Sequence, residues 1–230
     1  MIYKKYIKRF LDIIFSLFFI ILLSPLFLLI IILILLKEGR PSIFKQKRVG
    51  YKEEIFSMYK FRTMTNEKDK DGNLLPNNER VTKFGNFLRR SSLDELPELV
   101  NILKGDMSFI GPRPLLVRYL PYYEEEERRR HDLRPGLTGL SQVKGRNKMT
   151  WRERFKWDVK YVDNVSFKLD CKILWETVKV VLTAKNVADA GEEKVDEFGE
   201  YSLYNGRKYR PFDKEREYEI YLRENNLSDE

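Results

Sequence analysis

The sequence contains only one cysteine, Cys171, and one histidine, His131, in 230 residues. A single cysteine excludes an intramolecular disulfide and argues against a zinc site. Its apolar-rich surroundings, FKLDCKILWE, favour a buried or interfacial thiol over a nucleophile. Chemistry of the Ser-His-Asp or Cys-His type would depend on His131 alone, and a lone histidine is more often structural. The chain also lacks a P-loop, a dinucleotide fingerprint and any helix-turn-helix, zinc or RNA-binding signature.

Positive charge is concentrated in the first four-fifths of the chain. The net charge is +8 overall, but residues 187–230 contain 13 acidic and 7 basic residues. Residues 1–186 therefore contain 36 basic and 22 acidic residues, a net charge of +14. Such a basic body indicates an anionic partner, which could be nucleic acid, an anionic membrane or a phosphorylated substrate. The length suits one domain with attachments.

A run of 24 residues, from Ile13 to Leu36, is apolar except for Ser16, Ser24 and Pro25. About 20 apolar residues suffice to cross a bilayer, and the run is too long and lacks the cleavage site of a signal peptide. We therefore expect a membrane-bound chain. Basic residues flank both ends of the run, so the positive-inside rule gives a spanning helix no orientation. This pattern favours a re-entrant helix that breaks at Ser24-Pro25 and returns to the same side; a kinked helix that crosses the bilayer is the alternative.

The next segments predict a small sheet and several helices. Residues 42–64 alternate apolar and polar side chains around a turn, which predicts a β-hairpin. Lys60 and Arg62 fall on one strand face and could present paired cations, although an ordinary solvated face is the alternative. Residues 66–80 are predicted to form a loop and residues 107–110 a short buried strand. Helices are predicted over residues 82–90, 151–162 and 166–184.

Two of the predicted helices have unusual composition. Residues 122–132 contain EEEE followed by RRR, which predicts an exposed, charged helix. Residues 151–162 carry an aromatic and apolar stripe beside basic residues. That stripe suits a helix at a membrane interface, and core packing is the more usual explanation.

The segment RRSSLDELPEL, residues 89–99, has the pattern of a helix start. Ser91 stands three residues before Asp94, and Ser92 three residues before Glu95, so either pair predicts a capping box. Acidic residues in a first helical turn also complement the helix dipole. Taken alone, the segment favours this structural explanation over a catalytic one.

Two further segments suit contacts with phosphate. Pro112 and Pro114 stiffen the backbone around Arg113, and a stiffly held arginine suits bidentate contact with phosphate. A rigid turn that happens to contain arginine is an equally good explanation. Residues 133–147, LRPGLTGLSQVKGRN, predict a polar loop or hairpin whose glycines would let backbone amides approach a phosphate.

Taken in order, several strings closely resemble the motifs of the bacterial sugar transferases, the small monotopic phosphoglycosyl transferases that start glycan assembly. These strings are YKFRTM, SLDELPEL, LKGDMSFIGPRP, RPGLTGLSQVKGRN and YVDNVSFKLD. The resemblance implies a mostly helical α+β fold, with a re-entrant membrane helix over residues 1–36. A cytosolic catalytic domain over residues 37–186 would contain interfacial amphipathic helices and a small β-hairpin or sheet element. The acidic extension, residues 187–230, lies outside the match, and the small form of the family is expected.

The resemblance also implies a reaction. A sugar 1-phosphate would pass from a UDP-sugar to a polyprenyl (undecaprenyl) phosphate, with release of UMP and a covalent phosphosugar-aspartate intermediate. Mg²⁺ is the expected cofactor. The expected location is the inner (cytoplasmic) membrane, with the catalytic domain on the cytoplasmic face of the lipid bilayer. Downstream glycosyltransferases and a homo-oligomer are further partners to consider, and nucleic acid is not expected.

Most site residues follow from the same resemblance, position by position. Asp94 matches the nucleophile, and Glu95 and Asp170 match two further catalytic carboxylates. Asp94 and Glu95 would hold the metal ion, and Ser24-Pro25 matches the break in the membrane helix. Lys60, Arg89 and Arg113 match basic positions at the active site or the adjacent membrane surface. Two more basic residues are expected to bind substrate from their own positions: Arg62 on the strand face of Lys60, and Arg146 in the polar segment 133–147. Leu140 stands where many members carry tryptophan.

Two other hypotheses remain at this stage. The +14 body would also suit a membrane-tethered nucleic-acid-binding protein, and the acidic extension would suit a scaffold that recruits other glycan enzymes. The sequence does not identify the sugar, because donor choice depends on a few pocket contacts.

Overall fold

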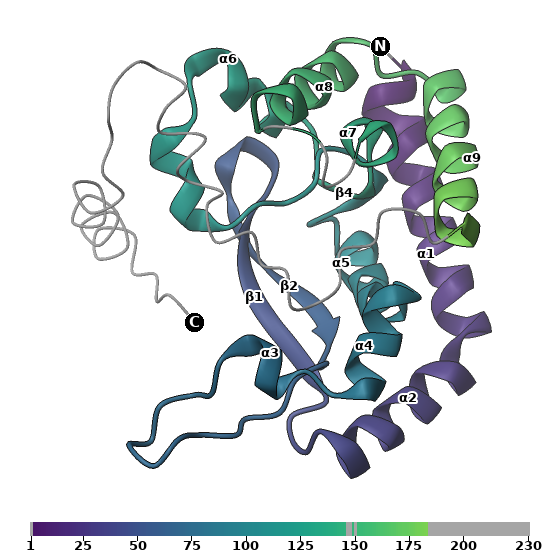
Figure 1. Ribbon diagram of the computed structural model, residues 1–230. Coiled ribbons are helices and arrows are strands. Elements are labelled where there is room, and N and C mark those ends of the chain that lie inside the picture. The colour runs from purple at the N-terminus through teal and green to yellow at the C-terminus, as the bar shows by residue number, and fades with distance from the viewer. Residues whose placement is uncertain (1, 146–148, 150, 184–230) are drawn as a thin grey trace.

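The computed structural model describes residues 2–145, 149 and 151–183 (Figure 1). The acidic extension and Arg146 therefore lie outside the described residues. Most of the described chain is helical, and its strands form two small sheets, as the sequence predicts. The elements in chain order are η1 (Tyr3–Ile7), α1 (Lys8–Leu22), α2 (Ser24–Lys37), β1 (Ile43–Val49), η2 (Tyr51–Glu53), β2 (Ile55–Phe61), α3 (Asn77–Arg80), α4 (Lys83–Arg90), η3 (Leu93–Glu95), α5 (Glu98–Lys104), β3 (Ser108–Ile110), η4 (Val117–Tyr122), α6 (Glu125–Arg128), η5 (Arg129–Asp132), β4 (Gly136–Thr138), α7 (Leu140–Lys144), α8 (Trp151–Asp163) and α9 (Phe167–Thr183).

The long apolar run forms two helices, α1 and α2, that meet at a break. Leu23 between them leaves the helical conformation, with φ −93° and ψ 4°. Pro25 lies in the first turn of α2, where its missing N–H group would have no partner within the helix in any case. The Ser24 hydroxyl donates to the carbonyl oxygen of Ile21 at 2.8 Å, which satisfies a backbone group freed by the break. The structure thus has a break where Ser24-Pro25 predicts one.

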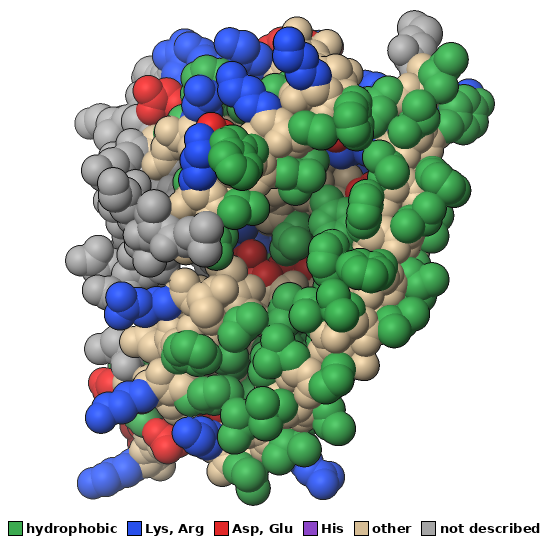
Figure 2. Space-filling view, turned by 90° about the vertical axis from the view of Figure 1, so that its right-hand side faces the viewer, with side chains coloured by type: hydrophobic (Ala, Val, Ile, Leu, Met, Phe, Trp, Pro, Cys, Tyr) green, Lys and Arg blue, Asp and Glu red, His purple; other side chains and the backbone are tan. Residues whose placement is uncertain are grey.

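One face of α1 and α2 is strongly apolar and exposed. Figure 2 shows hydrophobic side chains gathered over this side of the molecule. Seven large apolar side chains of the two helices are more than half exposed: Phe10, Phe18, Ile21, Leu22, Leu28, Leu29 and Leu36. Within the described residues, no single helix is long and apolar enough to cross a bilayer. The segments Tyr3–Leu22 and Ser24–Lys37 reach that length and composition only together, and they bend by 62°.

The start of α1 is attached to α9 by a buried carboxylate, Asp170. Its Oδ2 accepts hydrogen bonds from Lys8 Nζ at 2.7 Å and from the Tyr3 hydroxyl at 2.6 Å. Its Oδ1 accepts from the Tyr161 hydroxyl of α8 at 2.7 Å. Asp170 is 2% exposed and Lys8 is 8% exposed. Because a buried charge needs a partner, this cluster fixes α1 beside α9 (Figure 1).

Two more polar contacts attach α1 to the centre of the fold. The Arg9 guanidinium donates to two carbonyl oxygens at the C-terminal end of α5, at 2.6 and 2.9 Å. Carbonyl oxygens in the last turn of a helix retain acceptor capacity, and a cation suits that end of the helix dipole. Asp12 accepts from the Ser108 hydroxyl and the Phe109 amide of β3, both at 3.1 Å. The apolar helix is therefore held by charged side chains on its inner face.

Both sheets have two strands. β1 and β2 form the predicted antiparallel hairpin, with Ile43 opposite Phe61 and Val49 opposite Ile55. β3 and β4 pair in parallel, with Ser108 opposite Gly136. Glycine is required at this junction, because a Cβ on Gly136 would lie 2.0 Å from the backbone nitrogen of Gly111.

Helix α5 packs against β2 through a buried asparagine. Asn101 is fully buried, accepts from the Tyr59 amide at 3.0 Å and donates to the Ser57 carbonyl oxygen at 2.8 Å. Around it, α5 and β2 share a hydrophobic cluster with Met107, and apolar residues of α1 and α2 pack against that cluster. This packing sets the position of α5 relative to β2, and hence of the charged residues that the two elements carry.

Two sequence-based expectations about local structure are wrong, and a third pattern is decided in favour of one of its two explanations. Residues 133–147 form neither a loop nor a hairpin, since they contain β4 and the short helix α7. Residues 122–132 are not simply exposed, because Arg130 is 1% exposed and forms an ion pair with the equally buried Asp158 at 2.8 Å. The stripe on α8 is core and not interface, since Trp151, Phe155 and Val162 are buried. In each case tertiary packing decided an issue that the local pattern left open.

The buried pair Lys8–Asp170 leads to a prediction. Asp170→Asn removes the negative charge and leaves the Lys8 ammonium buried without its counter-ion, so unfolding free energy should fall by about 3–5 kcal/mol. Denaturant or thermal unfolding in detergent measures the change. The double variant Lys8→Met/Asp170→Leu should lose less than the sum of its two single variants. An Asp170→Asn variant as stable as the wild type would contradict the anchoring role.

Candidate active site

A cavity of about 610 Å³ lies between η3, α5, the β3–β4 sheet, α7 and α9. Its volume is in the range of small-molecule sites, roughly 300–1,000 Å³. Figure 2 shows it as a hollow with acidic side chains at its floor, surrounded by hydrophobic side chains. The charged residues that line it are Lys60, Arg89, Asp94, Glu95, Arg113 and Arg154. Five of the six are site residues predicted from the sequence, and Arg154 is the exception.

The acidic residues reach the cavity through a tight turn after α4. The helix ends at Ser91, whose hydroxyl donates back to the Phe87 carbonyl oxygen at 2.8 Å. Ser92 then adopts the left-handed conformation, with φ 56°, which is uncommon and costly for a residue with a Cβ. The capping-box prediction is therefore wrong: neither serine caps a helix start, and Asp94 and Glu95 lie in the 3₁₀ turn η3, ahead of α5.

Asp94 is the carboxylate that faces the cavity. It is 9% exposed, and no side chain among the described residues donates a hydrogen bond to it. Burial, together with the nearby Glu95 charge, raises the pKa of Asp94 to about 6, although Lys60 and Arg113 oppose the rise. The group is thus still mainly ionised near neutral pH, and its lone pairs are available to a ligand.

Glu95 lies beside Asp94 and is held by two cations. Its Oε1 accepts from Lys60 Nζ at 2.7 Å and from Arg113 Nη2 at 3.0 Å. Burial alone would raise the pKa of Glu95, but these two cations lower it to about 2. Glu95 therefore stays ionised and keeps the ammonium and the guanidinium next to Asp94.

Glu98 joins this cluster, and the sequence analysis missed it. Its Oε1 lies 3.3 Å from Lys60 Nζ, so Lys60 bridges two carboxylates. Burial and the Glu95 charge raise the pKa of Glu98 to about 7, against the attraction of Lys60. The spacing from Glu95 to Glu98, three residues, brings both side chains to one side of a helical turn, and this was the available signal.

The backbone of Arg113 is positioned by a second, buried ion pair, between Arg130 and Asp158. Arg130 Nη2 donates to the Arg113 carbonyl oxygen at 2.7 Å. Arg130 is in turn paired with Asp158, whose other oxygen accepts from the Ser141 hydroxyl at 2.7 Å. The stiff GPRP backbone and this pair together fix the guanidinium that contacts Glu95.

Other predicted site residues have different positions. Arg89 lines the cavity and its Nε donates to the Thr63 hydroxyl at 2.9 Å. Arg62 does not line it: the side chain is buried and donates to the carbonyl oxygens of Met64 and Arg40. Its role in the structure is to hold two backbone segments together, in place of the expected contact with substrate.

Asp170 is also not brought to the cavity. Both of its oxygens accept hydrogen bonds, from Tyr3, Lys8 and Tyr161, and these contacts give it the anchoring role described above; its expected catalytic role stays a prediction. Arg146 lies outside the described residues. The glycines expected to approach phosphate instead allow close backbone packing; a Cβ on Gly139 would lie 2.1 Å from the Gly111 carbonyl oxygen.

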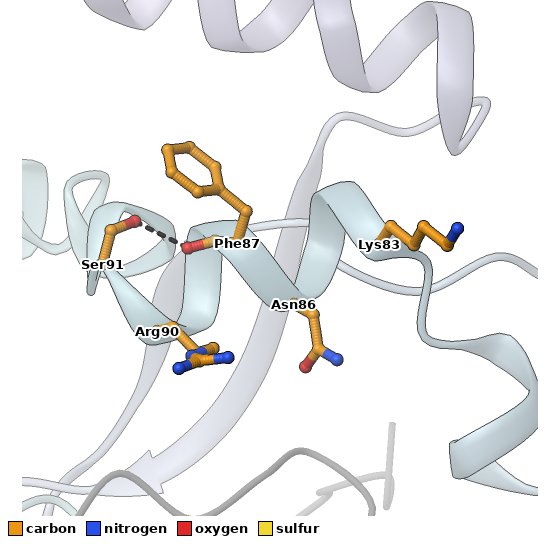
Figure 3. A pocket seen from close by; sticks show the side chains of 5 residues that line it. All are labelled: Lys83, Asn86, Phe87, Arg90 and Ser91. Carbon is orange, nitrogen blue, oxygen red and sulfur yellow. Dashed lines mark hydrogen bonds between the residues drawn. The ribbon is translucent and has the colours of Figure 1, made fainter. Parts of the chain in front are cut away.

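A second, shallower depression of about 490 Å³ lies along α4 (Figure 3). All its lining residues belong to one helix and its last turn: Lys83, Asn86, Phe87, Arg90 and Ser91. Among the described residues, no acidic side chain lines it and no second element encloses it. The cavity that contains Asp94 is therefore the candidate active site.

Comparisons with known proteins identify the family of the chain. The family model for bacterial sugar transferases matches residues 3–184. The chain belongs to the bacterial sugar transferase family. It is therefore an enzyme, a transferase, and the resemblance stated from its motifs is confirmed.

Individual relatives agree with the family assignment. The "uncharacterized sugar transferase EpsL" of Bacillus subtilis is 47% identical over 192 residues, covering 84% of this transferase and 95% of EpsL. The undecaprenyl-phosphate galactose phosphotransferase of Salmonella typhimurium is 38% identical over 197 residues, covering 78% of this chain and 41% of that protein. The UDP-glucose:undecaprenyl-phosphate glucose-1-phosphate transferase of Caulobacter vibrioides is 38% identical over 189 residues, covering 78% of this chain and 71% of that protein.

The side chains that could act as metal ligands limit how a metal ion could bind to the transferase. Within the described residues, no group of three or more His, Cys, Asp or Glu side chains could hold one. Asp94 offers a carboxylate without a hydrogen-bond donor, and Glu95 has one oxygen taken by two cations. This set fits Mg²⁺ bound by one or two carboxylates and mainly by substrate phosphates and water.

The buried Glu98 leads to a prediction about pH. Its pKa is raised from 4.5 to about 7 in the folded state, so the native protein binds this proton more tightly than the unfolded chain does. The stabilisation that this proton gives the folded state is complete below the pKa that Glu98 has in the unfolded chain. It is lost as the pH rises through about 7. Glu98→Gln cannot lose a proton. Relative to the variant, the wild type should therefore lose about 2–3 kcal/mol of unfolding free energy between about pH 5 and about pH 8.

Denaturant unfolding of both proteins at the two pH values measures this difference. A difference between wild type and variant that does not change with pH would contradict a Glu98 that is protonated in its buried site.

Proposed function

We propose that this transferase moves a sugar 1-phosphate from a UDP-sugar to a polyprenyl phosphate, giving a polyprenyl-diphosphate-sugar and UMP. The product would start assembly of a bacterial glycan such as a capsule, O-antigen, exopolysaccharide or protein-linked glycan. The names of the Salmonella and Caulobacter relatives support these substrate classes. The observation that carries the proposal is Asp94, a nearly buried carboxylate that faces the cavity beside Lys60 and Arg113.

In the first half-reaction, a carboxylate oxygen of Asp94 attacks the phosphorus that bears the sugar. A bond forms between this oxygen and phosphorus, the bond from phosphorus to the bridging oxygen breaks, and UMP leaves with the electron pair. No proton needs to move. Lys60 and Arg113, both within 3.0 Å of Glu95, supply positive charge beside the reacting phosphate.

In the second half-reaction, an oxygen of the acceptor phosphate attacks the same phosphorus. The bond from phosphorus to Asp94 breaks, and the carboxylate is regenerated. Because donor and acceptor use one carboxylate in turn, we expect ping-pong kinetics. The pKa of about 6 keeps Asp94 ionised for the first attack and makes it a better leaving group than a group of high pKa.

We also propose Mg²⁺ as cofactor, with Asp94 and Glu95 as the protein ligands. When bound, Mg²⁺ would neutralise charge on the phosphates. The two cations on Glu95 leave its second oxygen for that role, and Arg89 at the cavity wall adds charge for phosphate binding.

The proposed location is the cytoplasmic face of the inner membrane, with α1 and α2 as a re-entrant pair. Support comes from the 62° bend, from the exposed apolar face and from basic residues at both ends of the pair. A second apolar face, on α9, would lie at the interface: Phe167 is 59% exposed and Trp175 is 62% exposed, beside several lysines. Both substrates, one soluble and one in lipid, could then reach one cavity.

The central step predicts the behaviour of Asp94→Asn. A panel of UDP-sugars is first screened with the wild type for UMP release, and the active donor is prepared with label in its sugar phosphate. The wild type should retain label on the protein after denaturation, whereas Asp94→Asn should retain none and lose at least about 1,000-fold in turnover, since an amide is a poor nucleophile.

Asp71→Asn is the matched control, because it makes the same chemical change in an exposed loop outside the cavity. It should label like the wild type. Full turnover by Asp94→Asn would overturn the proposed mechanism.

A further inference from the structure

The cavity has two chemically different sides. Its charged side contains Asp94 and the cations around it, as described above. Its other side is an apolar wall formed by residues of four elements: Phe109 of β3, Leu137 of β4, Val143 of α7, and Leu174, Val180 and Val181 of α9. This wall offers dispersion and hydrophobic contact, and it has few polar atoms that a nucleotide or a sugar could bind.

Polar side chains next to the wall are largely satisfied by one another. The hydroxyl groups of Thr138 and Thr177 are 2.7 Å apart and hydrogen-bonded. The Ser141 hydroxyl donates to Asp158. Gln142 also lines the cavity, and its buried Oε1 has no partner among the described residues. Apart from this amide oxygen, the wall offers little to a sugar with many hydroxyl groups, and its apolar surface suits hydrocarbon.

The apolar wall continues onto the exposed apolar face of the molecule. Leu174 and Val181 both line the cavity and are also 44% and 42% exposed, so they form part of its rim. Figure 2 shows hydrophobic side chains around the hollow, continuous with those over α1 and α2. A hydrocarbon chain could therefore pass from the cavity to the apolar surface without crossing a polar barrier.

We propose that the apolar wall, with Leu174 and Val181 of α9 at its rim, binds the phosphate-proximal part of the acceptor's isoprenoid chain. This inference rests on the proposed function. A cavity of about 610 Å³ cannot enclose a long isoprenoid chain, so the chain leaves it, and an exit across an apolar rim costs the least. The acceptor's phosphate then lies at the charged side, next to Asp94, while the chain runs along α9 towards the lipid.

The proposal separates the two half-reactions. Donor chemistry uses the charged side and should not depend on the wall, whereas capture of a long-chain acceptor should. Val178 provides a matched control, because it is a valine on the same helix, 49% exposed, and it does not line the cavity. Val178→Gln and Val181→Gln therefore remove the same apolar group from α9, and only the second changes the cavity.

The experiment uses the full-length protein in nanodiscs. The wild type is compared with three single variants: Val181→Gln, Leu174→Gln and Val178→Gln. Stoichiometric UMP release without acceptor measures the donor half-reaction. Steady-state kinetics with undecaprenyl phosphate and with the short geranyl phosphate measures the acceptor half-reaction. We expect Val181→Gln and Leu174→Gln to raise the KM for undecaprenyl phosphate about five- to tenfold, from loss of apolar contact, with UMP release unchanged. The KM for geranyl phosphate should rise by a similar factor, because this short acceptor keeps the phosphate-proximal isoprene units.

Three results would overturn the proposal. A lowered yield or rate of UMP release in Val181→Gln would assign the wall to the donor. An equal rise in KM for Val178→Gln would assign the effect to contact of α9 with the bilayer and not to the cavity. An unchanged KM in both cavity variants would remove the wall from acceptor binding. Absence of UMP release from the wild type with any UDP-sugar would instead refute the proposed function itself, so the two failures are distinguishable.

Discussion

The active site depends on one ammonium group, that of Lys60, held between the carboxylates of Glu95 and Glu98. β2 contributes Lys60, the turn η3 contributes Glu95, and the start of α5 contributes Glu98, so three elements must be in register for the cluster to form. Asn101 sets that register by bonding α5 to the backbone of β2. With Glu95 neutralised by Lys60 and Arg113, Asp94 is the carboxylate left to react. The same cations that stabilise the fold locally are the ones that phosphate chemistry requires.

The apolar helix α1 is attached to this cluster by charged residues and not by apolar packing alone. Arg9 bonds to the end of α5, Asp12 bonds to β3, and Lys8 bonds to Asp170. α5 begins at Glu98 and β3 leads into Arg113, so these contacts connect the apolar face to both sides of the catalytic centre. The proposed transfer from a soluble donor to a lipid acceptor would need this fixed relation between the apolar surface and Asp94.

The sequence predicted the hairpin, the helix break, the long helices and most of the charged lining of the cavity, because these depend on local patterns or on motif strings. It did not predict Glu98 in the cluster, since nothing local indicates that Lys60, far along the chain, will lie 3.3 Å away. Arg62 and Asp170 were assigned to the site from their motifs, but burial and complete hydrogen bonding give them structural roles. The capping box failed for a related reason: Ser92 adopts a left-handed conformation that a propensity argument does not anticipate.

The proposed covalent mechanism depends most directly on Asp94 carrying the sugar phosphate between two substrates. Isotope exchange tests this: labelled UMP is incubated with the enzyme and unlabelled UDP-sugar, with no acceptor present. If the first half-reaction is complete in itself and reversible, label should appear in UDP-sugar without any polyprenyl phosphate. If label enters UDP-sugar only when acceptor is added, or never does while full turnover proceeds, a direct transfer between donor and acceptor would replace the covalent mechanism.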